Sequence, residues 1–232
     1  MTSSLHAFET KADLAEALAE RVADALSAAI AERGTASLAV SGGSTPKAFF
    51  QTLSAKVIDW PSVIITLVDE RFVPPDHERS NEKLVHENLI HGPAAAARFA
   101  PLYYPTATVE EAAATATRQT AGFGTPFDVV ILGMGNDGHT ASFFPGGSRL
   151  EEALSADTPR GVMTMEAEGA GEPRLTFTFS SLADARLLAL HIEGEGKKTV
   201  LAEAEAPGPE TQMPIRAILR RASSPVEIYW AP

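Results

Sequence analysis

One histidine stands in a setting that suits acid–base chemistry. His139 ends the run Gly133-Met-Gly-Asn-Asp-Gly-His139, which directly follows the apolar segment Phe127–Leu132. Since a neutral imidazole accepts a proton near pH 7, His139 is the best general-base candidate among the 6 histidines. Asp137 either orients the imidazole or caps the following turn, and the spacing leaves both roles open. The alternative for His139 is a histidine that only satisfies its own loop.

The same run also matches the dinucleotide pattern G-x-G-x-x-G. That pattern requires a helix that opens at the third glycine and an acidic residue about 20 positions later. Here the chain continues instead through His139–Gly147, where Pro145 and two glycines interrupt helix formation. A nicotinamide site is therefore not expected. What remains is a glycine-rich loop that presents Asp137 and His139.

A second loop has the residue types of a phosphate-binding site. It consists of Ser41, Gly42, Gly43, Ser44 and Thr45, followed by Pro46 and a short apolar helix. Adjacent glycines allow close backbone approach, and a helix N-terminus offers free N–H groups to an anion. The hydroxyls of Ser44 and Thr45 add donors, although the lysine of a Walker loop is missing. A plain turn capped by Ser44 or Thr45 fits the same residues.

Three ionisable residues, Asp69-Glu-Arg71, follow the most apolar predicted strand, Val63–Val68. A carboxylate at this point can act on protons, and an arginine can grip an anion or stabilise an oxyanion. The alternative is a structural cluster of ion pairs at the strand end. The spacing of three further cations, Arg174, Lys197 and Arg216, gives no signal. No serine lies in the G-x-S-x-G pattern of a serine-hydrolase elbow.

Composition excludes several classes of protein. The 232 residues contain no cysteine, so a thiolate nucleophile, an iron–sulfur cluster and a cysteine-ligated zinc are excluded. The net charge of −11 disfavours binding to nucleic acid. The N-terminus lacks a secretory signal, and no apolar run is long enough to span a membrane. His86 and His91 have the wrong interval for two ligands on one helix face, and no metal site is expected. We expect a cytoplasmic protein.

The remaining histidines are expected at surface or packing positions: His6, His77, His86, His91 and His191.

The elements that position these loops alternate between strands and helices. Strands are expected at Leu38–Val40, Val63–Val68, Phe127–Leu132, Arg174–Phe179, Leu187–Ile192 and Val226–Trp230. Helices are expected at Lys11–Arg33, around Phe49–Leu53, and at Ser80–Leu89, Ala94–Ala97, Ala112–Ala116 and Lys197–Glu205. This alternation predicts a single α/β domain over residues 1–232, with a mostly parallel, Rossmann-like sheet and helices on both faces. Ligands of such sheets gather at the carboxyl ends of strands, where the three loops begin.

In this order, the segments closely resemble the 6-phosphogluconolactonase family, which shares a larger group with the glucosamine-6-phosphate deaminases. The matching segments are Ser41–Pro46, Val68–Pro74, Arg79–Asn81, Leu132–Ser142, Phe144-Pro145, Pro173–Thr176, Gly194–Lys197 and Pro214–Arg216. They extend from about residue 38 to the C-terminus. Single matches are weak, but together they are highly specific.

The resemblance implies hydrolysis of 6-phospho-D-glucono-1,5-lactone to 6-phosphogluconate, the second step of the oxidative pentose phosphate pathway. It implies no cofactor and no metal. The Ser41–Thr45 loop, Arg174 and Lys197 would hold the phosphate. His139, with Asp137 beside it, would activate water. Arg71 would face the reacting ester, and Arg216 would help to close the pocket. The partner would be a small sugar phosphate lactone, and the protein a monomer or a weak homo-oligomer.

Two other functions fit parts of the sequence. A glucosamine-6-phosphate deaminase would use Asp69 to move the proton, but that family has tyrosine where this chain has Arg71, and a different run in place of Thr140–Ser142. A sugar-phosphate sensor without turnover is the second alternative. Sensors of this kind carry an attached helix-turn-helix, whereas residues 1–35 here are expected to form one long acidic helix.

Overall fold

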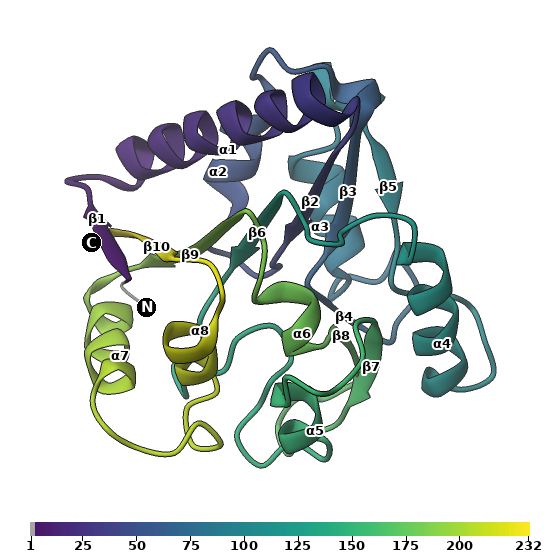
Figure 1. The fold of residues 1–232 in the computed structure, drawn as a ribbon, viewed down its shortest axis with the longest axis vertical. Helices are drawn as coiled ribbons and strands as arrows, with labels where there is room; N and C mark the ends of the chain where they lie inside the picture. Colours follow the sequence, from purple (N-terminus) through teal and green to yellow (C-terminus); the bar gives the residue numbers. More distant parts are fainter. Residues whose placement is uncertain (1–2) are drawn as a thin grey trace.

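A seven-stranded sheet forms the centre of the molecule (Figure 1). The computed structural model describes residues 3–232. The strand order is β1-β10-β9-β6-β2-β3-β5, and every neighbouring pair runs parallel. The strands are β1 (Ser4–Ala7), β2 (Ala36–Val40), β3 (Val63–Leu67), β5 (Arg98–Ala100), β6 (Val129–Leu132), β9 (Leu187–Glu193) and β10 (Val226–Ala231). The predicted parallel sheet is therefore confirmed.

A second, three-stranded antiparallel sheet was not expected. It contains β4 (Asp69–Arg71), β8 (Arg174–Phe177) and β7 (Val162–Met165), in the order β4-β8-β7. Val68 joins the two sheets, because its N–H donates to the carbonyl of Val40 at 2.9 Å and its carbonyl accepts from the N–H of Phe177 at 3.0 Å. The Asp69-Glu-Arg71 triplet is thus a strand rather than a loop, and β8 lies outside the parallel sheet.

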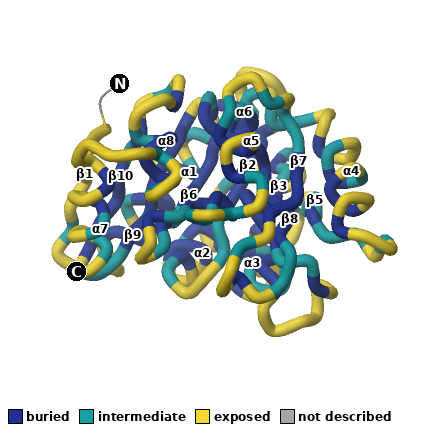
Figure 2. The backbone as a smooth tube through the Cα atoms, turned by 90° about the horizontal axis from the view of Figure 1, so that it is seen from below, coloured by how far each residue is buried: buried dark blue, intermediate teal, exposed yellow. Residues whose placement is uncertain are grey.

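Helices cover both faces of the large sheet, as predicted. Figure 2 places α2 and α3 on one side of it and α6 and α8 on the other. The helices are α1 (Lys11–Arg33), α2 (Lys47–Ser54), α3 (Asn81–Asn88), α4 (Val109–Thr120), α5 (Leu150–Leu154), α6 (Phe179–Leu182), α7 (Glu195–Glu205) and α8 (Ile215–Arg221), with 3₁₀ turns η1 (Trp60–Ser62) and η2 (Gly92–Ala96). The helix expected at Ala94–Ala97 is thus the 3₁₀ turn η2. Within residues 3–232, no helix has both the length and the apolar character that crossing a bilayer requires.

The longest helix, α1, begins and ends where the sequence predicts. The hydroxyl of Thr10 accepts a hydrogen bond from the N–H of Asp13 at 3.1 Å, which caps the first turn. Gly34 ends the helix with a φ of 80°. The expectation that residues 1–35 form only this helix was wrong, because β1 precedes it. All four residues of β1 are exposed, so no alternation of apolar and polar side chains marks the strand.

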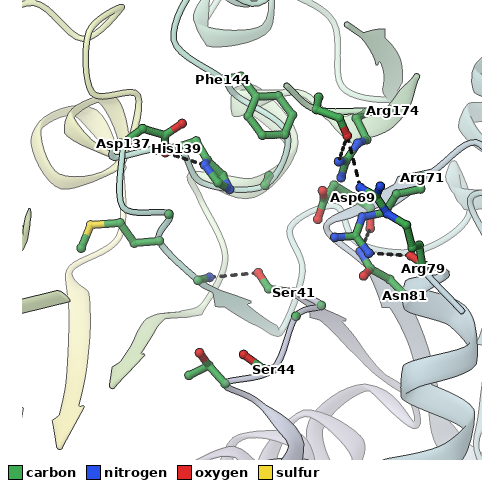
Figure 3. Close-up of a pocket in the computed structure, with 18 of the residues that line it drawn as sticks. Ser41, Ser44, Asp69, Arg71, Arg79, Asn81, Asp137, His139, Phe144 and Arg174 are labelled. Atoms are coloured by element: carbon green, nitrogen blue, oxygen red, sulfur yellow. Dashed lines mark hydrogen bonds and ion pairs between the residues drawn. The ribbon is translucent and has the colours of Figure 1, made fainter. Parts of the chain in front are cut away.

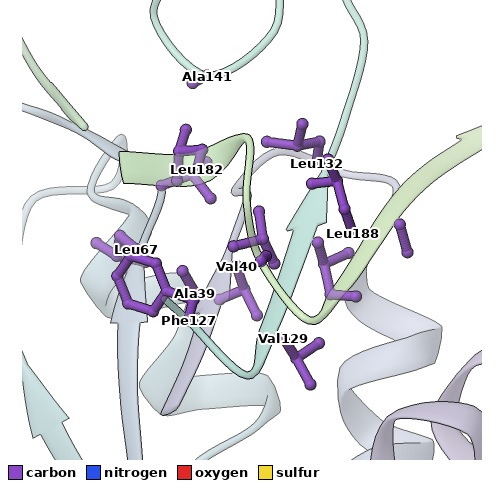
Figure 4. Close-up of a cluster of buried hydrophobic side chains, with 14 of the residues drawn as sticks. Ala39, Val40, Leu67, Phe127, Val129, Leu132, Ala141, Leu182 and Leu188 are labelled. Atoms are coloured by element: carbon purple, nitrogen blue, oxygen red, sulfur yellow. The ribbon is translucent and has the colours of Figure 1, made fainter. Parts of the chain in front are cut away.

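The core lies between the sheet and its helices (Figure 4). All five residues of β2 and all four of β6 are buried, as expected for strands covered on both faces. Phe127 and Leu182 close this cluster and are almost fully buried. The carboxyl ends of β2 and β6 are therefore held rigidly, and the loops that follow them start from fixed positions.

Candidate active site

A cavity of about 500 Å³ opens where the carboxyl ends of β2, β6 and β9 meet the small sheet. Eleven of the twelve predicted site residues line it: Ser41, Gly42, Gly43, Ser44, Thr45, Asp69, Arg71, Asp137, His139, Arg174 and Lys197. Figure 3 shows His139 and Asp137 on one wall and the arginines on the opposite wall. Segments that are far apart in the sequence thus meet in one place, as the strand-end argument predicts.

His139 and Asp137 form a hydrogen-bonded pair at the rim of the cavity. Oδ1 of Asp137 lies 2.6 Å from Nδ1 of His139 and 3.1 Å from its backbone nitrogen. Burial opposes the ionisation of Asp137, but these bonds and the attraction of the imidazole outweigh it and lower the pKa of the carboxyl. An ionised Asp137 makes Nδ1 the donor, which leaves Nε2 free to accept a proton. Asp137 thus contacts both the ring and the backbone N–H of His139, so the two roles that the sequence left open, orienting the imidazole and capping the turn, occur together.

Phe144 lies between His139 and the arginines. Its ring centroid is 4.7 Å from that of His139, and the Cζ atom of Arg174 lies 5.4 Å from the Phe144 centroid. Both the imidazole and the guanidinium therefore contact the same aromatic ring, so the base and the cation stand on the two sides of one side chain (Figure 3).

Gly135 leaves room for the histidine–aspartate pair. A Cβ atom at this position would lie 2.1 Å from Nδ1 of His139 and 2.6 Å from Oδ1 of Asp137. Any larger residue would push the imidazole away. This glycine of the G-x-G-x-x-G run therefore serves the acid–base pair, and no helix begins at Gly138 as a dinucleotide site would require.

Three arginines share the opposite wall. Arg71 and Arg174 are register partners in the β4–β8 pair, and Arg79 lines the same cavity. Burial, with the charges of Arg71 and Arg79, lowers the pKa of Arg174, while Asp69 and Glu172 pull it upwards. Three guanidinium groups against the two carboxylates of Asp69 and Glu172 leave a net positive charge, which makes this wall a receptor for anions.

Two further residues, Arg79 and Asn81, line the cavity, and the family resemblance implies no role for either. Nη2 of Arg79 lies 3.1 Å from Oε2 of Glu172. The amide nitrogen of Asn81 donates to the carbonyl of Asp69 at 2.9 Å. A Cβ atom at Gly42 would lie 1.9 Å from Oδ1 of Asn81, so this glycine is required by close packing. Their one sequence signal was the Arg79–Asn81 match.

The adjacent carboxylates of Asp69 and Glu70 point to different places, the first into the cavity and the second to the start of α3. Asp69 lines the cavity, and its Oδ2 accepts a hydrogen bond from the hydroxyl of Ser142 at 2.6 Å. Glu70 is fully buried and accepts from the hydroxyl of Ser80 and from the N–H groups of Asn81 and Glu82. Burial raises the pKa of Glu70 despite these bonds. Glu70 therefore caps α3 and does not pair with an arginine side chain.

Ser41 ties two strands of the large sheet together. Its hydroxyl donates to the carbonyl of Ile131 and accepts from the N–H of Gly133, both at 3.0 Å. Ser44, by contrast, is exposed in the cavity, and Pro46 begins α2 without a side-chain cap. The plain-turn interpretation, in which Ser44 or Thr45 caps the helix, is thus not what the structure shows. The first N–H groups of α2 remain available for an anion.

Lys197 supplies a further cation to the cavity. It lies in the first turn of α7, directly after β9. Burial lowers the pKa of its ammonium, and the nearby charge of Asp137 acts in the opposite direction. Lys197 and Ser44 therefore line the same cavity.

Arg216 does not reach the cavity, in contrast to the expectation that it helps to close the pocket. Its guanidinium is buried and donates to the carbonyls of Ala204 at 3.3 Å, Pro209 at 3.1 Å and Glu203 at 2.9 Å. All three carbonyls belong to the last turn of α7 and the chain after it. Arg216 thus holds α7 and α8 together, and no group on it faces the cavity.

His191 lines the cavity although the sequence assigned it only a surface or packing position. It is 3% exposed. Nothing in the sequence singles out His191, because it lies inside the apolar strand β9 rather than in the Gly194–Lys197 segment that follows. Residues 3–232 contain no cluster of three or more histidine, aspartate or glutamate side chains arranged around a metal position.

The sequence and the fold have clear counterparts among known proteins. The chain belongs to the family of glucosamine-6-phosphate isomerases and 6-phosphogluconolactonases, whose model matches residues 9–230. A 6-phosphogluconolactonase of Rhizobium meliloti is 68% identical over 232 residues, which cover 100% of both chains. The crystal structure of a 6-phosphogluconolactonase from Shewanella baltica superposes with a TM-score of 0.95 and is 41% identical, with 99% of this chain and 98% of that chain covered.

A monomeric glucosamine-6-phosphate deaminase shares the fold, as the sequence predicted. Its TM-score is 0.80 at 17% identity, with 100% of this chain and 97% of that chain covered. This likeness concerns the fold alone.

Proposed function

We propose that this protein hydrolyses 6-phospho-D-glucono-1,5-lactone to 6-phosphogluconate, in the pentose phosphate pathway. The observation on which the proposal depends is the His139–Asp137 pair, which opens onto a cavity lined with cations. The high identity to 6-phosphogluconolactonases over the full chain supports the same conclusion.

The reaction needs one base and one water molecule. Nε2 of His139 takes a proton from water while the water oxygen forms a bond to the lactone carbonyl carbon. Asp137 stabilises the imidazolium that results. The tetrahedral intermediate then breaks its bond to the ring oxygen, which receives the proton from His139 and becomes a hydroxyl. General-base catalysis of this kind contributes roughly 10² to 10⁴-fold, and no covalent intermediate is required.

The cations serve the two ends of the substrate. The phosphate is held by the Ser41–Thr45 loop, the N-terminus of α2, Lys197 and Arg174. Arg71 faces the ester, where a guanidinium stabilises the negative charge that develops on the carbonyl oxygen. Ser41 contributes through the backbone position that its hydroxyl bonds fix, since that hydroxyl already has two partners.

Asp69 has a structural role in this mechanism. Its carboxylate is buried, accepts from Ser142 and pulls the pKa of Arg174 upwards. It therefore keeps the arginine wall in place. In a deaminase Asp69 would move a proton at the carbon beside the carbonyl, and nothing about its contacts calls for that role.

The test is acid release from freshly generated 6-phosphogluconolactone, followed in a pH-stat and corrected for spontaneous ring opening. We expect rapid release that saturates with substrate. Ammonia release from glucosamine 6-phosphate would instead indicate a deaminase. Saturable binding without acid production would indicate a sensor. Sedimentation of the same sample tests the expectation of a monomer or a weak homo-oligomer.

A further inference from the structure

His191 is a buried histidine with one ring nitrogen unused. It is 3% exposed, and Nδ1 has no hydrogen-bond partner in the part of the chain that the structure describes. The ring meets Phe49 edge-on, with centroids 6.0 Å apart. An apolar side chain would fill this position without leaving a buried nitrogen unpaired, so packing alone does not account for a histidine here.

The other ring nitrogen is held by a carboxylate. Nε2 of His191 lies 3.3 Å from Oε1 of Glu193, and Oε2 of Glu193 lies 3.3 Å from Nζ of Lys11. The bond from His191 is the largest influence on Glu193 and lowers the pKa of its carboxyl. An ionised Glu193 accepts a hydrogen from Nε2. Only Nδ1 is then left to act in the cavity.

Three observations place His191 at the end of the cavity that we assign to phosphate. Leu190 pairs with Leu132, so His191 lies beside the start of the loop after β6. Phe49, which contacts the imidazole, belongs to the first turn of α2. Lys197 follows β9 after a short connection and lines the same cavity. His191 therefore stands among the groups that border the N-terminus of α2.

We infer that His191 is a phosphate-binding residue, which in its protonated form donates Nδ1–H to a phosphate oxygen and Nε2–H to Glu193. The inference rests on the proposed function, because that function puts a phosphate at this end of the cavity. The proton that completes the imidazolium comes from solvent as the ligand binds. Glu193 acts on the charged imidazole as a positioning residue.

The charges around His191 determine when this proton is held. On its own strand, Glu193 favours the imidazolium, and Lys11 of α1 partly offsets that effect through its contact with Glu193. Lys197 of α7, like the three arginines of the cavity, opposes a further positive charge on the imidazole. Tyr229 of β10 is the register partner of His191, and burial raises the pKa of its hydroxyl, so it stays neutral. A bound phosphate dianion adds negative charge beside His191 and so favours the imidazolium. Its binding is therefore expected to be coupled to the uptake of a proton.

The first experiment compares His191→Phe with the wild type. Phenylalanine keeps the contact with Phe49 and removes both nitrogens. We expect the KM for 6-phosphogluconolactone to rise about tenfold with kcat within about twofold, and no change for glucono-1,5-lactone, which lacks the phosphate. His86→Phe, at a half-exposed position outside the cavity, is the control. An equal change with both lactones, or no change, would overturn the inference.

The second experiment measures proton uptake directly. Binding of inorganic phosphate at pH 8 is followed by calorimetry in buffers of different ionisation enthalpy. The wild type should take up more protons per phosphate bound than His191→Phe, and Glu193→Gln should fall between them. Equal uptake by all three proteins contradicts the assignment. His191→Gln replaces the phenylalanine variant if that protein does not fold.

These outcomes separate the inference from the proposed function. A wild type that binds phosphate with His191-dependent proton uptake but does not open the lactone refutes only the function. A wild type that opens the lactone but shows no dependence on His191 refutes only the inference.

Discussion

Asp137 forms two hydrogen bonds with His139: one carboxylate oxygen accepts from the ring nitrogen Nδ1 at 2.6 Å and from the backbone N–H at 3.1 Å. The two bonds fix the imidazole relative to its own main chain. The base therefore does not depend on a distant segment for its orientation.

Replacement of the base tests the mechanism. His139→Ala should lower kcat by roughly 10² to 10⁴-fold, because the proton acceptor is lost. The affinity for 6-phosphogluconate should change by less than about threefold, since the cations and the phosphate loop remain. Steady-state kinetics and product-binding calorimetry measure the two quantities. Parental activity in this variant would mean that another group is the base.

Two glycines of the same loop provide a matched pair. Gly135→Ala brings a methyl group to 2.1 Å from Nδ1 of His139, so the imidazole must move. We expect kcat to fall by about 10²-fold, the effect of a misplaced catalytic group. Gly133→Ala meets only Ser41, at 3.8 Å, and should retain nearly full activity. Similar kinetics for the two variants would show that the position of His139 is unimportant.

The cation at the phosphate end should act on binding alone. Lys197→Ala is expected to raise the KM for the phosphorylated lactone about tenfold, with a smaller effect at high salt because screening already weakens the attraction. Arg174→Ala should behave in the same way. The control is Lys198→Ala, since Lys198 stacks on Trp230 at 3.9 Å and does not line the cavity. An equal loss with the unphosphorylated lactone would contradict the phosphate assignment.

The two serines of the phosphate loop should separate stability from binding. Ser41→Ala removes the bonds to Ile131 and Gly133 and should cost about 1–2 kcal/mol of unfolding free energy. Ser44→Ala should leave that free energy within about 0.5 kcal/mol and raise the KM instead. Urea unfolding and steady-state kinetics distinguish them. The reverse pattern would make Ser41 the direct ligand of the phosphate.

One partly buried carboxyl, that of Glu82, should set a pH dependence of stability. Burial, together with the charge of Glu70, raises the pKa of Glu82 from 4.5 to about 7. As the pH rises, Glu82 therefore loses its proton in the unfolded chain before it does so in the folded protein. The free energy of unfolding falls between pH 4.5 and about 7 and stays at the lower value above that. Glu82→Gln should abolish this fall and be about 2 kcal/mol more stable than the wild type at pH 8.

Thermal and urea unfolding at pH 4.5 and pH 8 measure the effect of Glu82→Gln. The matched control is Glu87→Gln on the same helix, because the Glu87 side chain is 60% exposed. A stability difference that does not grow with pH would show that Glu82 ionises freely in the folded protein.

The sequence predicts the parallel sheet well because its central strands are continuous apolar runs with few alternatives. It does not predict the antiparallel sheet, since Asp69-Glu-Arg71 contains no apolar residue and becomes a strand only by pairing with β8. It also misses β1, whose exposed residues show no pattern. Pairing between distant segments decides both elements.

The candidate site follows the same division. The glycine-rich segments point to His139, Asp137 and the phosphate loop, because the backbone conformation of such loops depends mainly on neighbouring residues in the sequence. Arg216 and His191 lie in stretches without such marks, and only tertiary packing sends the first to the end of α7 and the second into the cavity. A side chain's direction inside a buried strand or helix is a property of the assembled fold.

The two sheets that meet at Val68 supply different groups to the cavity. The large sheet supplies the acid–base pair and the anion-binding loop, whereas Arg71 and Arg174 come from the small one. Evolution or engineering can therefore exchange the hairpin of β7 and β8 as a module. Such an exchange would replace Arg174 of β8, while Arg71 on β4, the Ser41–Thr45 loop and the His139–Asp137 pair would be retained.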